Sequence, residues 1–234
     1  MAAPTSGFTT QLNAISKTLV EQGHRVAELY ESACDAVFAM DVKAARAVVD
    51  ADDEIDRVDI EIEQRTVALL GEVASRAEPV SEGELRRMLT IVKVNNELER
   101  TADAAASIAE QAPVFAEIGV ALPDTLRVLT NSVAGILCDI TRSIERGDPR
   151  VAKAVLDAED TVEAFKSQLL RDAERGIASG DVSVDYAFAV HELANQCERI
   201  ADHATNIAEQ VIYVKTGAIV RHTDAGWIEL PRSS

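Results

Sequence analysis

Two segments of this chain each place a glutamate and an aspartate four residues apart. The segment "NNELERTADAAASIAEQ" begins at residue 95, and "ANQCERIADHATNIAEQ" begins at residue 194. Ten of their seventeen aligned positions are identical, including Glu99 and Asp103 in the first copy and Glu198 and Asp202 in the second. Because residues four apart lie on one face of a helix, each segment would present two neighbouring carboxylates on the same face.

A second internal match also carries acids. The segment "DVKAARAVVDADDEID", residues 41–56, aligns with "DPRVAKAVLDAEDTVE", residues 148–163, at seven identical positions. The matched acids at helical spacing are Asp52 and Asp56 in the first copy and Glu159 and Glu163 in the second. If the helices that carry the two motifs pack side by side, the carboxylates of each half would converge on one surface patch.

Clustered carboxylates are the ligands that hard cations prefer, and Ca²⁺, Mn²⁺ and iron are candidates. A solvated acidic surface is the commoner explanation for such residues. However, like charges four residues apart destabilise a helix by about 0.2–0.5 kcal/mol per pair, and this chain repeats that cost at four places. The register of the acids is also kept between the copies where many surrounding residues differ. The pattern therefore indicates metal sites.

The elements that would position these acids are six long helices. Turn signals and apolar periodicity place them at about 8–40, 42–76, 81–112, 124–146, 149–178 and 183–216. Ser81 and Glu84 form a capping-box pattern at the start of the third helix. Asp148 precedes Pro149, which predicts an N-cap followed by a proline in the first helical position.

The apolar spacing of the third and sixth helices defines their buried sides. Steps of three and four predict a core seam in each helix. The seam residues are Ile91, Val94, Leu98, Thr101, Ala105 and Ile108 in the third helix, and Val190, Leu193, Cys197, Ile200, Ala204, Ile207, Val211 and Val214 in the sixth. The acid pairs fall outside these seams, on the outer face of each helix.

The duplication predicts an all-α protein made of two tandem three-helix bundles. The first repeat would cover residues 1–116 and the second 117–217, and residues 218–234 would form a C-terminal tail for which the pattern predicts no element.

Composition excludes several classes of protein. The formal net charge is −17, which argues against nucleic acid as a partner because phosphate binding needs clustered Lys and Arg. Three cysteines without a CxxC motif are typical of a reducing compartment. No signal peptide and no stretch of 18 apolar residues are found, so we expect a cytoplasmic protein.

The repeated "ER-x-x-D" core resembles that of the PhoU family of phosphate-signalling proteins. The segment "CERIADHATNIAEQVIYVKTG" is similar to the family's C-terminal signature, "LERTADAAASIAEQ" is a looser version, and the resemblance covers about residues 8–222. It implies a cytoplasmic, homodimeric, non-enzymatic negative regulator of phosphate uptake and of the phosphate-starvation response. The partners it implies are a phosphate ABC transporter and a sensor histidine kinase.

The resemblance also implies metal clusters held by the E/D-x-x-x-D motifs, with iron the leading candidate and zinc, manganese and calcium as alternatives. The ligands it implies are Asp52, Asp56, Glu99 and Asp103 in the first repeat and Glu159, Glu163, Glu198 and Asp202 in the second. The first copy has Ala104 and Ser107 where the second has His203 and Asn206. If a histidine or an amide contributes to the second site, the first would bind metal more weakly.

Two other functions remain open from the residues alone. A metal-dependent enzyme, of the di-iron or phosphoesterase type, could use the same carboxylates. A helical scaffold without metal would need none of them.

Overall fold

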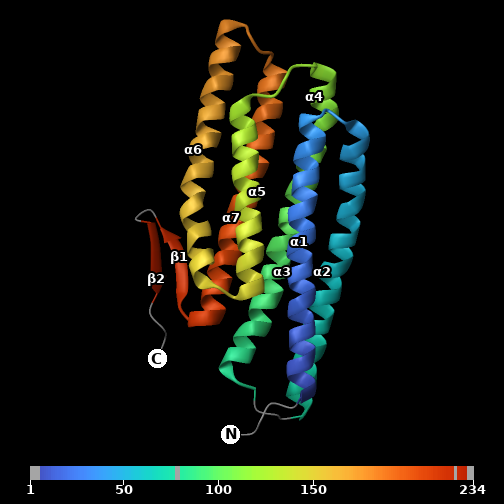
Figure 1. The fold of residues 1–234 in the computed structure, drawn as a ribbon, viewed down its shortest axis with the longest axis vertical. Coiled ribbons are helices and arrows are strands. Elements are labelled where there is room, and N and C mark those ends of the chain that lie inside the picture. Colours follow the sequence, from blue (N-terminus) through green and yellow to red (C-terminus); the bar gives the residue numbers. More distant parts are fainter. Residues whose placement is uncertain (1–5, 77–79, 224–225, 231–234) are drawn as a thin grey trace.

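The computed structural model describes residues 6–76, 80–223 and 226–230, and these form seven helices and one two-stranded sheet (Figure 1). The long helices run side by side along the long axis of the molecule. The elements are α1 (Ser6–Phe38), α2 (Val42–Arg76), α3 (Glu82–Ala109), α4 (Ala112–Ile118), α5 (Asp124–Arg146), α6 (Pro149–Ser179), α7 (Val184–Thr216), β1 (Ile219–Thr223) and β2 (Gly226–Leu230). None of these helices has an apolar stretch long enough to cross a bilayer.

The predicted helix starts are confirmed at atomic detail. The Ser81 hydroxyl accepts a hydrogen bond from the backbone N–H of Glu84, whose carboxylate accepts one from the backbone N–H of Ser81. Asp148 caps α6 by accepting from the backbone N–H of Arg150, with Pro149 in the first helical turn. These caps satisfy amide groups that have no partner within the helix.

The helices form two bundles, as the duplication predicts. Helices α1, α2 and α3 pack together, and so do α5, α6 and α7. The two bundles also pack against each other, α3 on α7 and α1 on α5 (Figure 1). One continuous hydrophobic core therefore runs through both. The predicted seams of α3 and α7 are buried in this core, except that Val214 is only half-buried.

Helix α4 was not predicted, and it connects the two repeats. Pro113 looks like a helix breaker in the sequence, but it lies in the first turn of α4, where a proline costs no hydrogen bond. Phe115 of α4 is fully buried and packs edge-on against Tyr186 of α7, with ring centroids 6.2 Å apart. The predicted boundary after residue 116 falls inside this helix.

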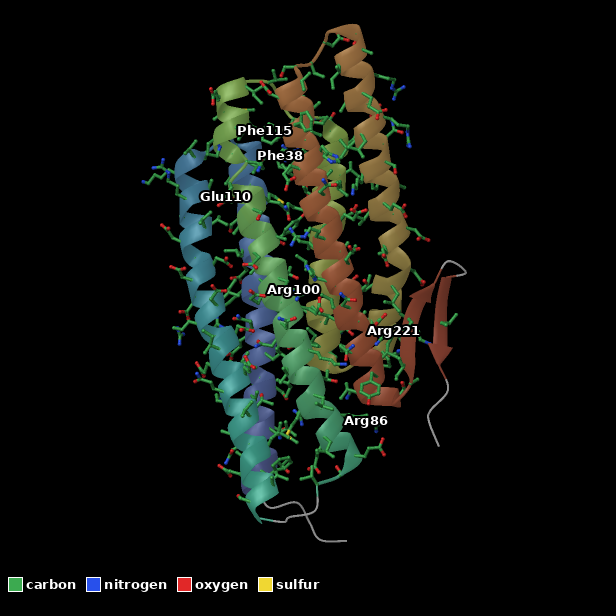
Figure 2. The ribbon with its side chains drawn as sticks, turned by 180° about the vertical axis from the view of Figure 1, so that it is seen from behind. Phe38, Arg86, Arg100, Glu110, Phe115 and Arg221 are labelled. Carbon is green, nitrogen blue, oxygen red and sulfur yellow. The ribbon has the colours of Figure 1, made fainter. Side chains whose placement is uncertain are left out.

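The C-terminal tail adds a β-hairpin to the helical fold. Strands β1 and β2 are antiparallel, and Ile219 pairs with Leu230 at the open end. Strand β1 packs on the end of α7 and buries Val220 there. Arg221 of β1, labelled in Figure 2, forms an ion pair with Glu209 of α7.

Candidate metal site

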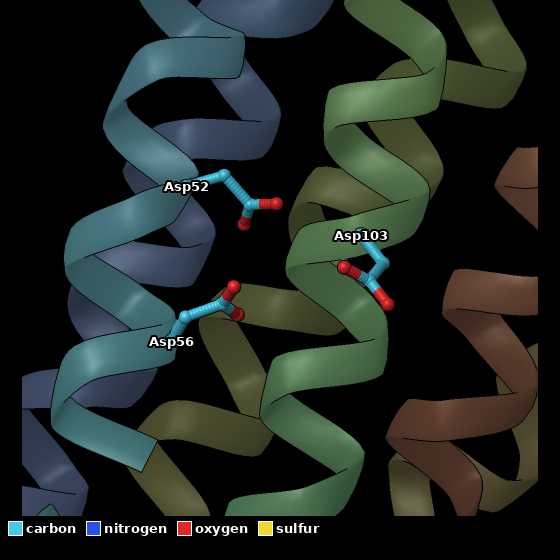
Figure 3. Close-up of side chains that lie close together, drawn as sticks. All are labelled: Asp52, Asp56 and Asp103. Atoms are coloured by element: carbon cyan, nitrogen blue, oxygen red, sulfur yellow. The ribbon is translucent and has the colours of Figure 1, made fainter. Parts of the chain in front are cut away.

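Three aspartates meet on the outer surface of the first repeat, where α2 lies beside α3. One carboxylate oxygen from each of Asp52, Asp56 and Asp103 lies within 4.8 Å of the others (Figure 3). Asp52 and Asp56 come from successive turns of α2, and Asp103 reaches them from α3. The predicted convergence of the two motifs is therefore seen for three of the four acids of this repeat.

Burial of the neighbouring apolar residues sets the direction of these side chains. Ile55 and Val58 of α2 and Ala102 of α3 are almost completely buried. Each helix is thereby fixed in rotation about its axis, and the aspartates next to these residues lie at the edge of the α2–α3 contact. The acids are held close together by core packing rather than by any attraction between them.

The electrostatics of the cluster show how unfavourable this arrangement is without a cation. Burial, together with the charges of Asp103, Asp56 and Asp53, raises the pKa of Asp52 to about 6. The Oδ1 atom of Asp52 is buried and has no hydrogen-bond partner within the described part of the chain. A buried carboxylate oxygen without a donor is costly, and a bound cation would satisfy it.

Glu99, the fourth predicted ligand of this repeat, borders the cluster. It is half-buried on α3 and lies outside the group of three. Its pKa is raised by burial and then by the charges of Asp103, Asp59 and Asp56. Glu99 therefore belongs to the same electrostatic patch.

Asp59 is a member of this patch that the sequence analysis missed. Its pKa is raised by burial and by the charges of Glu63 and Asp56, although a hydrogen bond from the Asn95 side chain, at 2.6 Å, opposes the shift. Its three-residue spacing from Asp56 is the signal that could have identified it.

The second repeat places a lysine among its acids. The ammonium group of Lys166 on α6 forms an ion pair and hydrogen bond with Glu198 on α7, and both side chains are partly buried. At the offset of 107 residues that relates the two repeats, Lys166 stands where the first repeat has Asp59. A carboxylate in the first repeat is thus replaced by a cation in the second. Aligning only the acidic residues of the two repeats does not reveal this exchange.

The remaining predicted ligands of the second repeat surround this ion pair. Burial and the charge of Glu198 raise the pKa of Asp202, against the opposing effects of His203 and Lys166. Glu163 is exposed on α6 and Glu159 is half-buried there. Across the described residues, the three aspartates of the first repeat are the only group of possible metal ligands whose ligand atoms all lie within 4.8 Å of one another.

His203 and Asn206 contact an acid of the other repeat. The Nδ1 atom of His203 lies 2.7 Å from Oε2 of Glu97, to which the Asn206 amide also donates at 3.2 Å. Glu97 belongs to α3, so these contacts join the two repeats. Burial would raise the pKa of Glu97, but the hydrogen bonds from His203 and Asn206 outweigh it and lower the pKa.

The residues of the first repeat fit a hard cation. The group of three offers carboxylate oxygens alone. Among the described residues, no histidine or cysteine joins it. This donor set suits iron, manganese and calcium better than zinc, which prefers nitrogen and sulfur ligands. The unsatisfied Oδ1 atom of Asp52 is the atom that such an ion would bind.

The fold and the site together define a class of protein. It consists of two tandem three-helix bundles and carries a carboxylate cluster on the first. The sequence profile of the PhoU domain matches the chain twice, at residues 19–112 and 126–211. The chain belongs to the PhoU family.

Similar proteins are found by sequence and by structure. A homologue of the phosphate-specific transport system accessory protein PhoU from Aquifex aeolicus is 30% identical, over 91% of this chain and 94% of its own length. PhoU homolog 1 from Thermotoga maritima is 27% identical, over 90% of this chain and 89% of its own. The crystal structure of PhoU from Pseudomonas aeruginosa superposes with a TM-score of 0.84 at 25% identity, covering 90% of this chain and 99% of that one.

Proposed function

We propose that this protein is a cytoplasmic regulator of phosphate uptake that restrains the phosphate-starvation response when phosphate is plentiful. The two PhoU domains and the names of the relatives, which are accessory proteins of phosphate-specific transport systems, support this proposal. The protein would act as a homodimer, through contact with a phosphate ABC transporter and a sensor histidine kinase. It would not be an enzyme.

The regulator would carry metal on its first repeat. The observation that carries this part of the proposal is the aspartate cluster, in which Asp52, Asp56 and Asp103 converge around an unsatisfied carboxylate oxygen. Glu99 and Asp59 would add negative charge beside the ion. Iron is the preferred ion in this proposal, with manganese, calcium and zinc as competitors.

The second repeat would bind metal more weakly than the first. A cation that enters between Glu198 and Asp202 must displace or approach the ammonium group of Lys166. Such an approach costs Coulomb repulsion as well as a charge-assisted hydrogen bond. Glu159 and Glu163 would then join the ligands only after Lys166 has moved.

A metal-dependent phosphoesterase is the alternative function for the same carboxylates. It would require turnover of a generic phosphoester that rises and falls with metal loading of the first repeat. We expect purified protein to show no such turnover. Among the described residues, the cluster contains carboxylates alone, and no histidine belongs to it that could act as a base.

The regulatory role can be tested in the source organism with a reporter of phosphate starvation. Deleting the gene should switch the reporter on in phosphate-rich medium, and the wild-type chain should switch it off again. Asp103→Asn should restore repression poorly, whereas the matched variant Asp202→Asn should restore it nearly fully. A reporter that stays off after the deletion would contradict the regulatory role, and equal repression by both variants would contradict the role of metal.

A further inference from the structure

A cavity of about 810 Å³ lies between the two repeats, far from the aspartate cluster. Its lining residues include the first turns of α3 and the ends of α5 and α7, and these helix ends lie toward the lower end of the bundle in Figure 1. Helices α1 and α3 supply one wall and α5 and α7 the other. Its volume falls in the range of about 300–1,000 Å³ that is typical of small-molecule sites.

The lining of this cavity combines apolar walls with polar side chains, among which the cations outnumber the anions. The apolar lining includes Leu19, Val20, Ile91, Val94, Ile144 and Val211. Lys17, Arg87, Arg146 and Lys215 bring four positive charges to the lining, and Glu21 and Glu145 bring two negative ones. Lys17 forms an ion pair with Glu21 at 3.5 Å, so the excess of positive charge comes from Arg87, Arg146 and Lys215. An excess of positive charge in a chain of net charge −17 indicates that the cavity attracts an anion.

Arg87 is held in place by neutral groups. Its Nη1 atom donates to the Asn13 side chain at 2.8 Å, and its Nη2 and Nε atoms donate to the Ser16 hydroxyl at 2.8 and 3.1 Å. Partial burial lowers the pKa of Arg87, and the charge of Glu84 opposes this shift. A fixed, partly desolvated guanidinium group is well suited to a phosphate or carboxylate.

Thr90 lies one helical turn beyond Arg87 and also lines the cavity. It is 8% exposed, and its hydroxyl has no hydrogen-bond partner among the described residues. The buried threonines Thr66 and Thr101 instead donate to the carbonyl four residues earlier in their own helices, at 2.8 and 2.7 Å. The Thr90 hydroxyl is therefore a buried polar group that a ligand could satisfy.

Lys215 lies at the edge of the cavity, where its side chain crosses the backbone of Gly147. Gly147 ends α5 with a positive φ of 57°, and a Cβ atom at this position would collide with the Cε and Nζ atoms of Lys215. The absence of a side chain at Gly147 lets the ammonium group cross the backbone there. Its charge is favoured by the negative end of the α5 dipole.

We propose that this cavity binds a nucleoside phosphate. The phosphate would accept hydrogen bonds from Arg87, with Lys215 and the other cations adding electrostatic attraction. The base would lie against the apolar walls, and the Thr90 hydroxyl would bond to the ligand inside the cavity. The site is separate from the aspartate cluster, so the proposal does not depend on metal binding.

The binding can be measured by isothermal titration calorimetry on the full chain at low salt, with AMP, adenosine and orthophosphate as probes. AMP should bind at one site per chain. Adenosine, which lacks the charge, and orthophosphate, which cannot use the apolar walls, should each bind at least about tenfold more weakly. Failure of AMP to bind at millimolar concentration, or equal binding of AMP and adenosine, would overturn the proposal.

Substitutions in the cavity lining test whether AMP binds there. Arg87→Gln should weaken AMP binding about tenfold or more, and Thr90→Val and Lys215→Gln about threefold each. Arg100→Gln is the matched control, because it removes the same charge from the exposed middle of α3 (Figure 2). Lys215 is exposed, so its variant serves if Arg87→Gln fails to fold. Equal affinity of Lys215→Gln, Arg87→Gln and Arg100→Gln for AMP would refute the site.

Discussion

At the scale of single residues, one exchange separates the two repeats. Asp59 in the first repeat and Lys166 in the second occupy equivalent positions. The aspartate adds to a cluster of negative charge, whereas the lysine neutralises the acids around it. The duplicated acid pairs thus have different electrostatic surroundings, although the pairs themselves are matched.

Replacing Lys166 should make the second repeat more receptive to cations. In Lys166→Gln the ammonium group is lost, so the repulsion between Glu198 and Asp202 becomes stronger. The metal bound per chain at a fixed free-metal concentration should rise above the wild-type value. The metal-free variant should be less stable by about 1 kcal/mol, the usual size for a hydrogen bond to a charged group with allowance for its partial exposure.

Lys153→Gln is the control for that variant, because Lys153 is exposed on the same helix. Metal content measured by mass spectrometry after dialysis should be unchanged in it. If both variants bound equal amounts of metal, Lys166 would have no part in controlling the second site.

The candidate site could be predicted only in part from the sequence. Spacing places Asp52 and Asp56 on one face of α2, and the duplication shows that the acids of α2 and α3 recur in α6 and α7. The contribution of Asp59 and the pairing of Lys166 depend on which side chains meet between helices. Neighbours within one helix follow from periodicity, whereas contacts between helices require their relative rotation and offset.

At the scale of elements, periodicity predicts the long helices well because each one buries a regular stripe. Ile91, Leu98 and Ile108 of α3 are nearly inaccessible, as their spacing requires. Helix α4 is too short to show such a period, and its Pro113 is also a common breaker. The strands of the terminal hairpin have only five residues each, so their pattern is equally weak.

The contact between α3 and α7 should contribute measurably to stability. Glu97→Ala removes the acceptor of hydrogen bonds from His203 and Asn206, which join the two repeats. We expect the free energy of unfolding to fall by about 1–2 kcal/mol in urea denaturation. Glu117→Ala, at an exposed position of α4, should change it by less than about 0.5 kcal/mol. Equal losses in both variants would contradict this role of Glu97.

At the scale of the whole molecule, the two repeats form one body with a common core. Helices α3 and α7 pack closely across the junction, and α4 anchors the connection through Phe115. The repeats are therefore expected to unfold together rather than one after the other.

The terminal hairpin should stabilise this body without being needed for the fold. Removing residues 218–234 exposes the surface that Val220 covers and breaks the ion pair between Arg221 and Glu209. We expect a loss of about 1–3 kcal/mol, most of it from apolar burial, with unchanged helical circular dichroism. A truncated chain that fails to form helices would show that the hairpin is essential to folding.

The central claim is that the first repeat holds the principal metal site. In the second repeat, the ammonium group of Lys166 neutralises the acids that would bind metal. Iron or manganese binding to metal-free protein should be compared in the wild type, Asp103→Asn and Asp202→Asn by equilibrium dialysis with metal analysis. We expect Asp103→Asn to lose the tightest binding and Asp202→Asn to retain it. Loss of that binding in Asp202→Asn with full binding in Asp103→Asn, or equal binding in all three proteins, would contradict the claim.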